Sequence, residues 1–78
     1  MSLRIQSKRV LYLKEWDEFV GVFLGVDYEE GGIIFDDYLV IVSDDFFHHF
    51  ASEQDFFKGK KIGIIKIDSE KYKFRIIV

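Results

Sequence analysis

The sequence predicts a small, mostly β fold that contains one helix. Three observations support this prediction: the chain has only 78 residues, several short stretches alternate apolar and polar residues, and one stretch instead follows the period of a helix. Hydrophobic residues make up 49% of the chain and aromatic residues 18%. Because a chain this short buries only roughly 60% of its unfolded surface, its core must be dense, and this composition supplies the density. We expect residues 1–78 to form a single domain.

The first two predicted strands cover residues 3–13 and 19–27. The second reads FVGVFLGVD, which places Phe19 and Phe23 on one face and the valines and Leu24 on the other. Two glycines lie in this strand, on the same face as the phenylalanines. Glycine inside a strand indicates sharp coiling or the close approach of another backbone. We therefore expect this strand to bend.

The third predicted strand, residues 33–42, reads IIFDDYLVIV. Its centre, Asp36 and Asp37, has two interpretations: a bulge in one bent strand, or a tight turn between two short strands. We favour one bent strand, because two-residue hairpin turns usually contain glycine.

Residues 44–57 follow a helical period. Ser43 or Asp44 suits the N-cap position, and Gly59 suits a left-handed C-terminal cap. One face of this helix carries aromatic residues that we expect to plug the open end of a small barrel; these residues are Phe46, Phe47, Phe50 and Phe57.

The last two predicted strands are residues 61–68 and residues 72–78. The final strand alternates clearly. Its apolar face carries Tyr72, Phe74, Ile76 and Val78, and the opposite side carries Lys71, Lys73 and Arg75. Such alternation predicts a strand with one buried and one exposed face.

Three strands, one helix and two strands is the element order of a five-stranded OB-like barrel, with its helix between strands three and four. An SH3-like small barrel is the alternative. In an OB barrel the first strand pairs with the fourth. That pairing would bring Arg9 close to residues 61–68 and to the cations of the last strand.

The charges divide the chain into three blocks. Residues 1–14 carry four cations and no acid, residues 15–57 carry twelve acids and no Lys or Arg, and residues 58–78 carry seven cations and two acids. This division predicts a basic surface on the terminal strands of a protein whose formal net charge is −3. The residues that we expect to bind an anion or a partner there are Lys71, Lys73 and Arg75, with Lys60, Lys61 and Arg9 as neighbours.

Catalysis is not expected. The chain has no cysteine, which excludes thiol chemistry and cysteine-based metal sites, and it contains none of the common catalytic or phosphate-binding motifs. We predict no cofactor and no metal site. His49 and Glu53, one helical turn apart, are weak metal candidates, because two ligands on one helix need a third from elsewhere.

The sequence therefore predicts a non-enzymatic binding module that mediates protein–protein contacts, either with a partner protein or by self-association. The alternative is nucleic-acid binding through the basic face, whose cations would contact phosphates. No secretory signal and no apolar run long enough for a membrane span is visible, so we expect a cytoplasmic protein without a membrane partner. Few amide side chains alongside many Lys, Glu and Ile give a weak indication of a thermophilic source.

Overall fold

The computed structural model describes residues 9–77. Within this range the chain forms six strands, an α-helix and a short 3₁₀ helix. The strands are β1 (Arg9–Tyr12), β2 (Glu18–Asp27), β3 (Gly32–Phe35), β4 (Tyr38–Ile41), β5 (Lys61–Lys66) and β6 (Tyr72–Ile76), and the helices are α1 (Asp44–Ser52) and η1 (Gln54–Phe56). Residues 3–8 of the predicted first strand and Val78 of the last lie outside the described residues.

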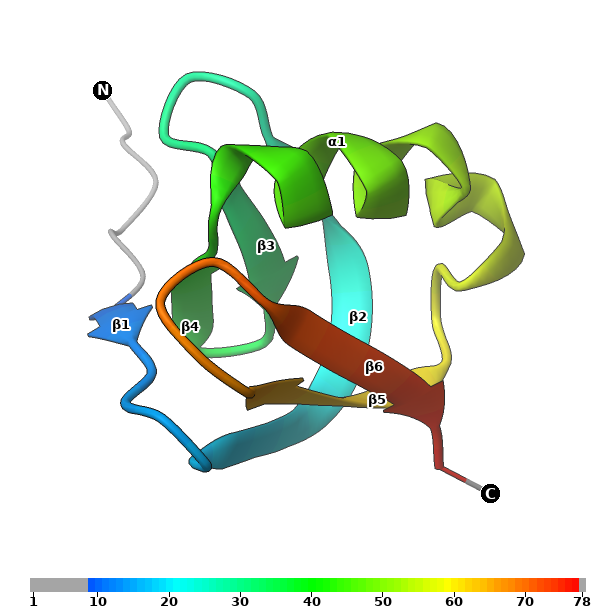
Figure 1. The fold of residues 1–78 in the computed structure, drawn as a ribbon. Helices are drawn as coiled ribbons and strands as arrows, with labels where there is room; N and C mark the ends of the chain where they lie inside the picture. The colour runs from blue at the N-terminus through cyan, green and yellow to red at the C-terminus, as the bar shows by residue number, and fades with distance from the viewer. Residues whose placement is uncertain (1–8, 78) are drawn as a thin grey trace.

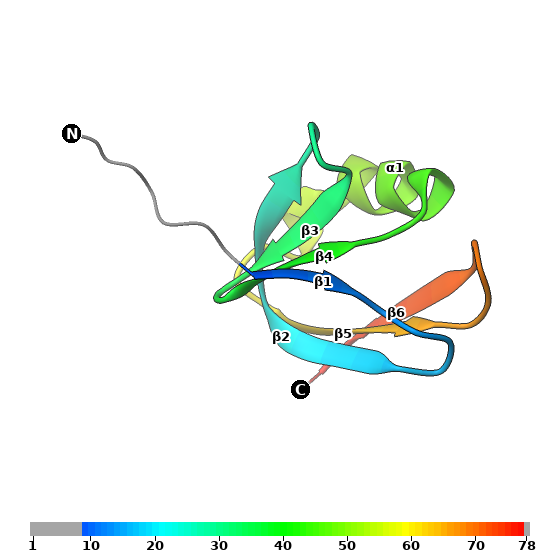
Figure 2. The same ribbon diagram turned by 90° about the vertical axis from the view of Figure 1, so that its left-hand side faces the viewer.

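The strands form one strongly curved sheet in the order β1-β4-β3-β2-β5-β6. All neighbouring strands are antiparallel except β1 and β4, which are parallel. Figures 1 and 2 show that β3, β4 and α1 lie on one side of the molecule and β5 and β6 on the other, and that the long β2 curves from one side to the other. In the described part of the chain, β1 and β6 each have one neighbouring strand. The sheet is therefore open there, and the barrel remains a prediction.

Two predictions about the strands are wrong. Residues 33–42 form the hairpin β3–β4 rather than one bent strand, with Asp36 and Asp37 in the bend between the two strands. The first strand pairs with β4 and not with β5. As a result, the described sheet has six strands instead of five, and Arg9 lies on the edge opposite to β6.

Strand β2 bends at a bulge, as its glycines indicate. The register with β3 shifts between Phe23 and Gly25. Before the shift Phe19 and Phe23 face the core, and after it Val26 packs against the core. The predicted grouping of Val26 with the outward valines is therefore wrong, because the extra residue of a bulge reverses the alternation.

Helix α1 begins where the sequence predicts. The hydroxyl of Ser43 accepts a hydrogen bond from the backbone N–H of Phe46 and donates one to the carbonyl of Glu70, which joins the helix start to the β5–β6 turn. The α-helix ends at Ser52, earlier than predicted, and η1 continues the path. Gly59 has the predicted positive φ, +82°, in the turn that leads to β5.

The core lies between α1 and the curved sheet, and aromatic rings fill it. Phe50 is fully buried, and its ring lies 5.0 Å from that of Phe23 and 4.8 Å from that of Phe74, measured between centroids. Phe46, Phe47 and Phe57 are also buried. The aromatic face of the helix therefore covers the interior of the sheet, while the plugging of a barrel end remains a prediction because the described sheet is open.

The turn between β1 and β2 contains the one described non-glycine residue with positive φ. Trp16 has φ 71°, and its side chain is 67% exposed. Its backbone N–H donates to the carbonyl of Lys66 at the end of β5. This bond ties the turn to the sheet and holds Trp16 in the left-handed region, which L-residues other than glycine, Asn and Asp rarely adopt.

Candidate functional site

The predicted alternation of the last strand is present in residues 71–75, whereas Ile76, which was predicted on the buried face, is 45% exposed at the end of the edge strand β6. Lys71, Lys73 and Arg75 are exposed, while Tyr72 and Phe74 are half-buried and pack against the core. Lys73 and Arg75 lie on β6, and Lys71 directly precedes it. Since β6 is at the edge of the sheet, the three cations line a border of the molecule.

Arg75 has a partner that the sequence did not suggest. Its Nε donates to Oε2 of Glu18 at 3.2 Å, across the intervening strand β5. Gly63 lies beneath this pair, and a Cβ there would be 2.7 Å from the same carboxylate oxygen. The absence of a side chain at Gly63 therefore makes room for the ion pair. Only the pairing of β2, β5 and β6 places Glu18 near Arg75, so no local sequence signal could have found it.

The other predicted cations are dispersed. Lys61 starts β5 and pairs with Val22, at the end of β5 that lies far from Lys71. Lys60 precedes the strand, and Arg9 lies on the opposite edge of the sheet. The structure therefore brings together Lys71, Lys73 and Arg75, but it does not gather all six predicted cations on one surface.

The backbone of β6 has one side without a neighbouring strand. Ile67 N–H donates to the carbonyl of Lys71, and Ile77 N–H donates to that of Lys61. Hydrogen-bonded pairs alternate along an antiparallel ladder, so residues 71, 73, 75 and 77 direct their backbone groups toward β5. The backbone groups of Tyr72, Phe74 and Ile76 point away from it. Within residues 9–77, the backbone groups of these three residues form no hydrogen bond to the backbone of a turn, a loop or a helix cap.

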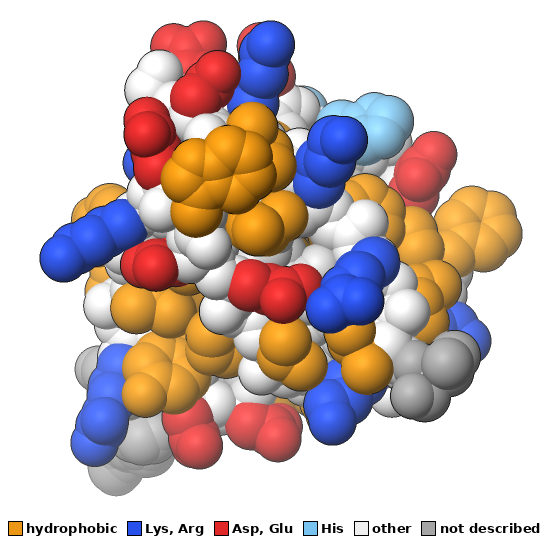
Figure 3. Space-filling view, turned by 60° about the horizontal axis from the view of Figure 1, so that its bottom comes forward, with side chains coloured by type: hydrophobic (Ala, Val, Ile, Leu, Met, Phe, Trp, Pro, Cys, Tyr) orange, Lys and Arg blue, Asp and Glu red, His pale blue; other side chains and the backbone are white. Residues whose placement is uncertain are grey.

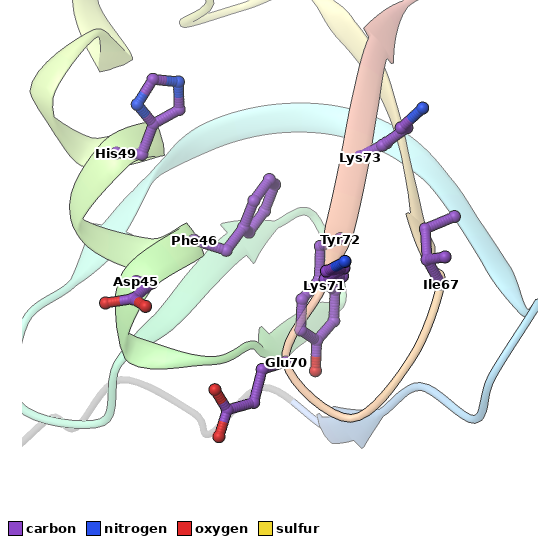
Figure 4. A pocket seen from close by; sticks show the side chains of 8 residues that line it. All are labelled: Asp45, Phe46, His49, Ile67, Glu70, Lys71, Tyr72 and Lys73. Atoms are coloured by element: carbon purple, nitrogen blue, oxygen red, sulfur yellow. The ribbon is translucent and has the colours of Figure 1, made fainter.

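This free edge borders a groove that separates the start of β6 from α1 (Figure 4). The groove has a volume of about 500 Å³, within the roughly 300–1,000 Å³ that is typical of ligand sites. Phe46 and His49 line it from the helix, and Tyr72 and Lys73 line it from the strand. The rings of Phe46 and Tyr72 stack with their centroids 5.3 Å apart, so an aromatic surface forms part of the lining.

Charges of both signs surround the groove. Lys71 and Lys73 line it on the strand side, and Asp45 and Glu70 line it near the helix start. Within the described residues neither lysine forms an ion pair. An adjoining hollow at the helix N-terminus is lined by Asp44 together with the same two acids. The groove therefore has cations along the strand and acids at one end.

The outer face of β2, β5 and β6 carries a second, smaller hollow of about 350 Å³ over Gly63. Val20, Val22 and Leu24 are exposed on the outer side of β2, by 42%, 36% and 45%. Figure 3 shows that the apolar side chains on this side of the molecule are separated by acids and cations and do not form one continuous patch. Lys73 lines this hollow as well as the groove.

The weak metal candidates His49 and Glu53 gain no further ligand from the fold. Residues 9–77 contain no group of three or more His, Cys, Asp or Glu side chains that could hold a metal ion. His49 instead lines the groove. In the same part of the chain, neither helix has the length and apolar character needed to cross a membrane.

The final strand and its cations were predicted from the sequence, but the groove was not. Phe46 and His49 reach the site because α1 crosses the curved sheet next to β6, and that placement depends on the order of all six strands. The chain matches no known family model, and comparisons with curated proteins and with solved structures found no significant similarity. The geometry of β6 and α1 therefore carries the functional argument.

Proposed function

We propose that this protein is a non-enzymatic binding module, and that it contacts a partner protein by accepting an extended segment of the partner along β6. The observation that carries this proposal is the row of outward backbone groups on Tyr72, Phe74 and Ile76 beside the groove. An extended peptide that adds to a sheet edge gains affinity from main-chain hydrogen bonds and specificity from the pockets that receive alternate side chains.

Helix α1 makes this edge more selective than a bare strand. Phe46 and Tyr72 offer stacked rings to a side chain that points inward from the added segment. Aromatic side chains are enriched among the residues that carry most of the energy of protein interfaces. His49 adds a polar group on the helix side of the groove.

The distribution of charge favours a protein partner over a nucleic acid. Single-strand binders combine a continuous cationic groove with stacking platforms. Here Arg75 is paired with Glu18, and Asp45 and Glu70 border one end of the groove, where they would repel a phosphate chain. The predicted cations Lys60 and Arg9 lie elsewhere.

The proposal is tested by NMR titration of the ¹⁵N-labelled protein with peptides selected from a random library displayed on phage. Strand addition predicts the largest amide shifts at Tyr72, Phe74 and Ile76, and slower amide exchange there. Shifts confined to Val20, Val22 and the rest of the outer face would contradict it. Steeply salt-dependent binding of labelled single-stranded DNA or RNA, measured by fluorescence anisotropy, would instead favour the nucleic-acid alternative.

A proline variant separates strand addition from side-chain contact. Ile76→Pro removes one outward N–H without removing a bond to β5, and proline is tolerated on edge strands in this orientation. We expect this variant to lose much of its peptide affinity, while Ile76→Ala, which removes most of the side chain but keeps the N–H, retains more. Equal affinities of the two variants would argue against the backbone contact.

A further inference from the structure

We infer that the segment accepted by β6 carries an acidic–apolar–acidic pattern over three consecutive residues. This inference rests on the proposed strand addition and specifies the chemistry of the partner. It follows from three features of the site: the side-chain alternation of β6, the pairing state of its cations and the aromatic lining of the groove.

The alternation of β6 fixes the faces of any strand added to it. Successive side chains of a strand point to opposite faces of the sheet, and side chains directly opposite each other on neighbouring strands lie about 4.5–5.5 Å apart between Cβ atoms. The residues of the added segment that stand opposite Lys71 and Lys73 therefore point to the outer face with them. The residue between these two points inward.

The two lysines are the cations available to such a segment. Within residues 9–77 they form no ion pair, whereas Arg75 is held by Glu18 at 3.2 Å. Opposite charges on directly opposed strand positions are favourable. Acids at two alternate positions of the segment would therefore complement Lys71 and Lys73.

The middle residue of the pattern faces an apolar surface. Tyr72, between the two lysines, points inward and is half-buried, and its ring stacks on that of Phe46. Lys66 also lies near this ring, with its Nζ 5.9 Å from the centroid, but it comes from β5, on the side away from the free edge. An apolar side chain in the segment would cover the exposed parts of these two rings.

The acidic stretch must be short. Asp45 and Glu70 line the groove beyond the start of β6, so further acids at that end would meet like charges. A uniformly acidic peptide is therefore a poorer match than the three-residue pattern with neutral or basic residues beyond it.

A second copy of this chain does not fit the same edge. In an antiparallel pair of β6 strands centred on Phe74, Lys73 would stand opposite Arg75 of the other copy. If the register shifts so that Tyr72 opposes Phe74, then Lys73 opposes Lys73. Like charges directly opposite each other destabilise a strand pair, so the charges select a partner with acidic side chains over self-addition.

The test compares labelled peptides of about seven residues that share neutral flanks and differ in their centre: Glu-Val-Glu, Gln-Val-Gln and Glu-Glu-Val. Two favourable cross-strand charge pairs predict that Glu-Val-Glu binds about 2- to 30-fold more tightly than Gln-Val-Gln. The permuted Glu-Glu-Val peptide has the same charge as Glu-Val-Glu but breaks the alternation. It should bind more weakly, and equal affinity of the two would overturn the pattern.

The protein variants locate the effect. In the double variant Lys71→Ser, Lys73→Ser, the preference for Glu-Val-Glu over Gln-Val-Gln should disappear. In the matched control Lys60→Ser, Lys61→Ser, which removes the same charge from the start of β5, it should persist. A preference lost equally in both variants would show attraction by net charge alone and would overturn the inference.

The two proposals fail in different ways. If all three peptides shift the amides of Tyr72, Phe74 and Ile76 equally, strand addition stands and the acidic–apolar–acidic pattern is wrong. If neither these peptides nor peptides selected from the random library shift those amides, both proposals are wrong.

Discussion

The two faces of strands β2, β5 and β6 differ in what they contact. On the inner face Phe23, Ile62 and Ile64 are fully buried, and Phe74 packs against three phenylalanine rings of the helical segment. On the outer face Lys73 and Arg75 are exposed, as are Val20 and Val22 of β2. The inner face fixes the fold through packing. The outer face and the edge of β6 can therefore change with little effect on stability, and we look for function there.

The largest difference in stability is expected between two alanine variants of the helical segment, residues 44–57. Phe50→Ala should lower the free energy of unfolding by roughly 3–5 kcal/mol, because it empties a fully enclosed site among aromatic rings. Phe56 is 73% exposed in the same segment, so Phe56→Ala should change stability by less than about 0.5 kcal/mol. Urea unfolding followed by circular dichroism measures both. A loss below about 1 kcal/mol for Phe50→Ala would mean that the helix does not cover the core.

A smaller difference in stability is expected between proline variants at two neighbouring residues of β6. Arg75→Pro removes an N–H that the ladder directs toward Gly63, whereas Ile76→Pro removes one that points outward. Loss of a ladder bond leaves an acceptor without its partner, so Arg75→Pro should be about 1–3 kcal/mol less stable than Ile76→Pro. Thermal unfolding of the two variants tests this order. The reverse order would mean that the free edge is on the opposite side of β6.

The smallest effect is expected on the outer face. Changing Lys71, Lys73 and Arg75 together to Ser should alter the free energy of unfolding by less than about 1 kcal/mol, because their side chains are solvated and exposed ion pairs contribute little. The Arg75 side chain is 68% exposed even within its pair with Glu18. A large drop in melting temperature for this triple variant would show that the cations stabilise the fold. It would contradict the expectation that the outer face contributes little to stability.

Features that depend on local patterns were predictable. The alternation around Tyr72 and Phe74 and the aromatic face of α1 follow from the spacing of apolar residues. The capping role of Ser43 follows from the preference for a short polar side chain before a helix. These features place the core and one face of the candidate site.

Features that depend on strand pairing were not predictable. The bend at Asp36 and Asp37 uses negative φ at both residues, so the usual requirement for glycine in a hairpin turn did not apply. The bulge in β2 moves Val26 to the face that packs on the core. Because β2 carries apolar residues on both faces, the sequence does not show where this change of face occurs. Arg9 is far from β6 because β1 pairs in parallel with β4, a contact between distant segments.

The exposed position of Trp16 has a practical consequence for these measurements. It is the only tryptophan of the chain, and its indole is largely in contact with water in the folded state. The colour of indole emission reports the polarity of its surroundings, and unfolding would change those surroundings little. Tryptophan fluorescence would therefore understate cooperative unfolding of this protein, whereas the buried phenylalanines and half-buried Tyr72 would report it through their near-ultraviolet circular dichroism.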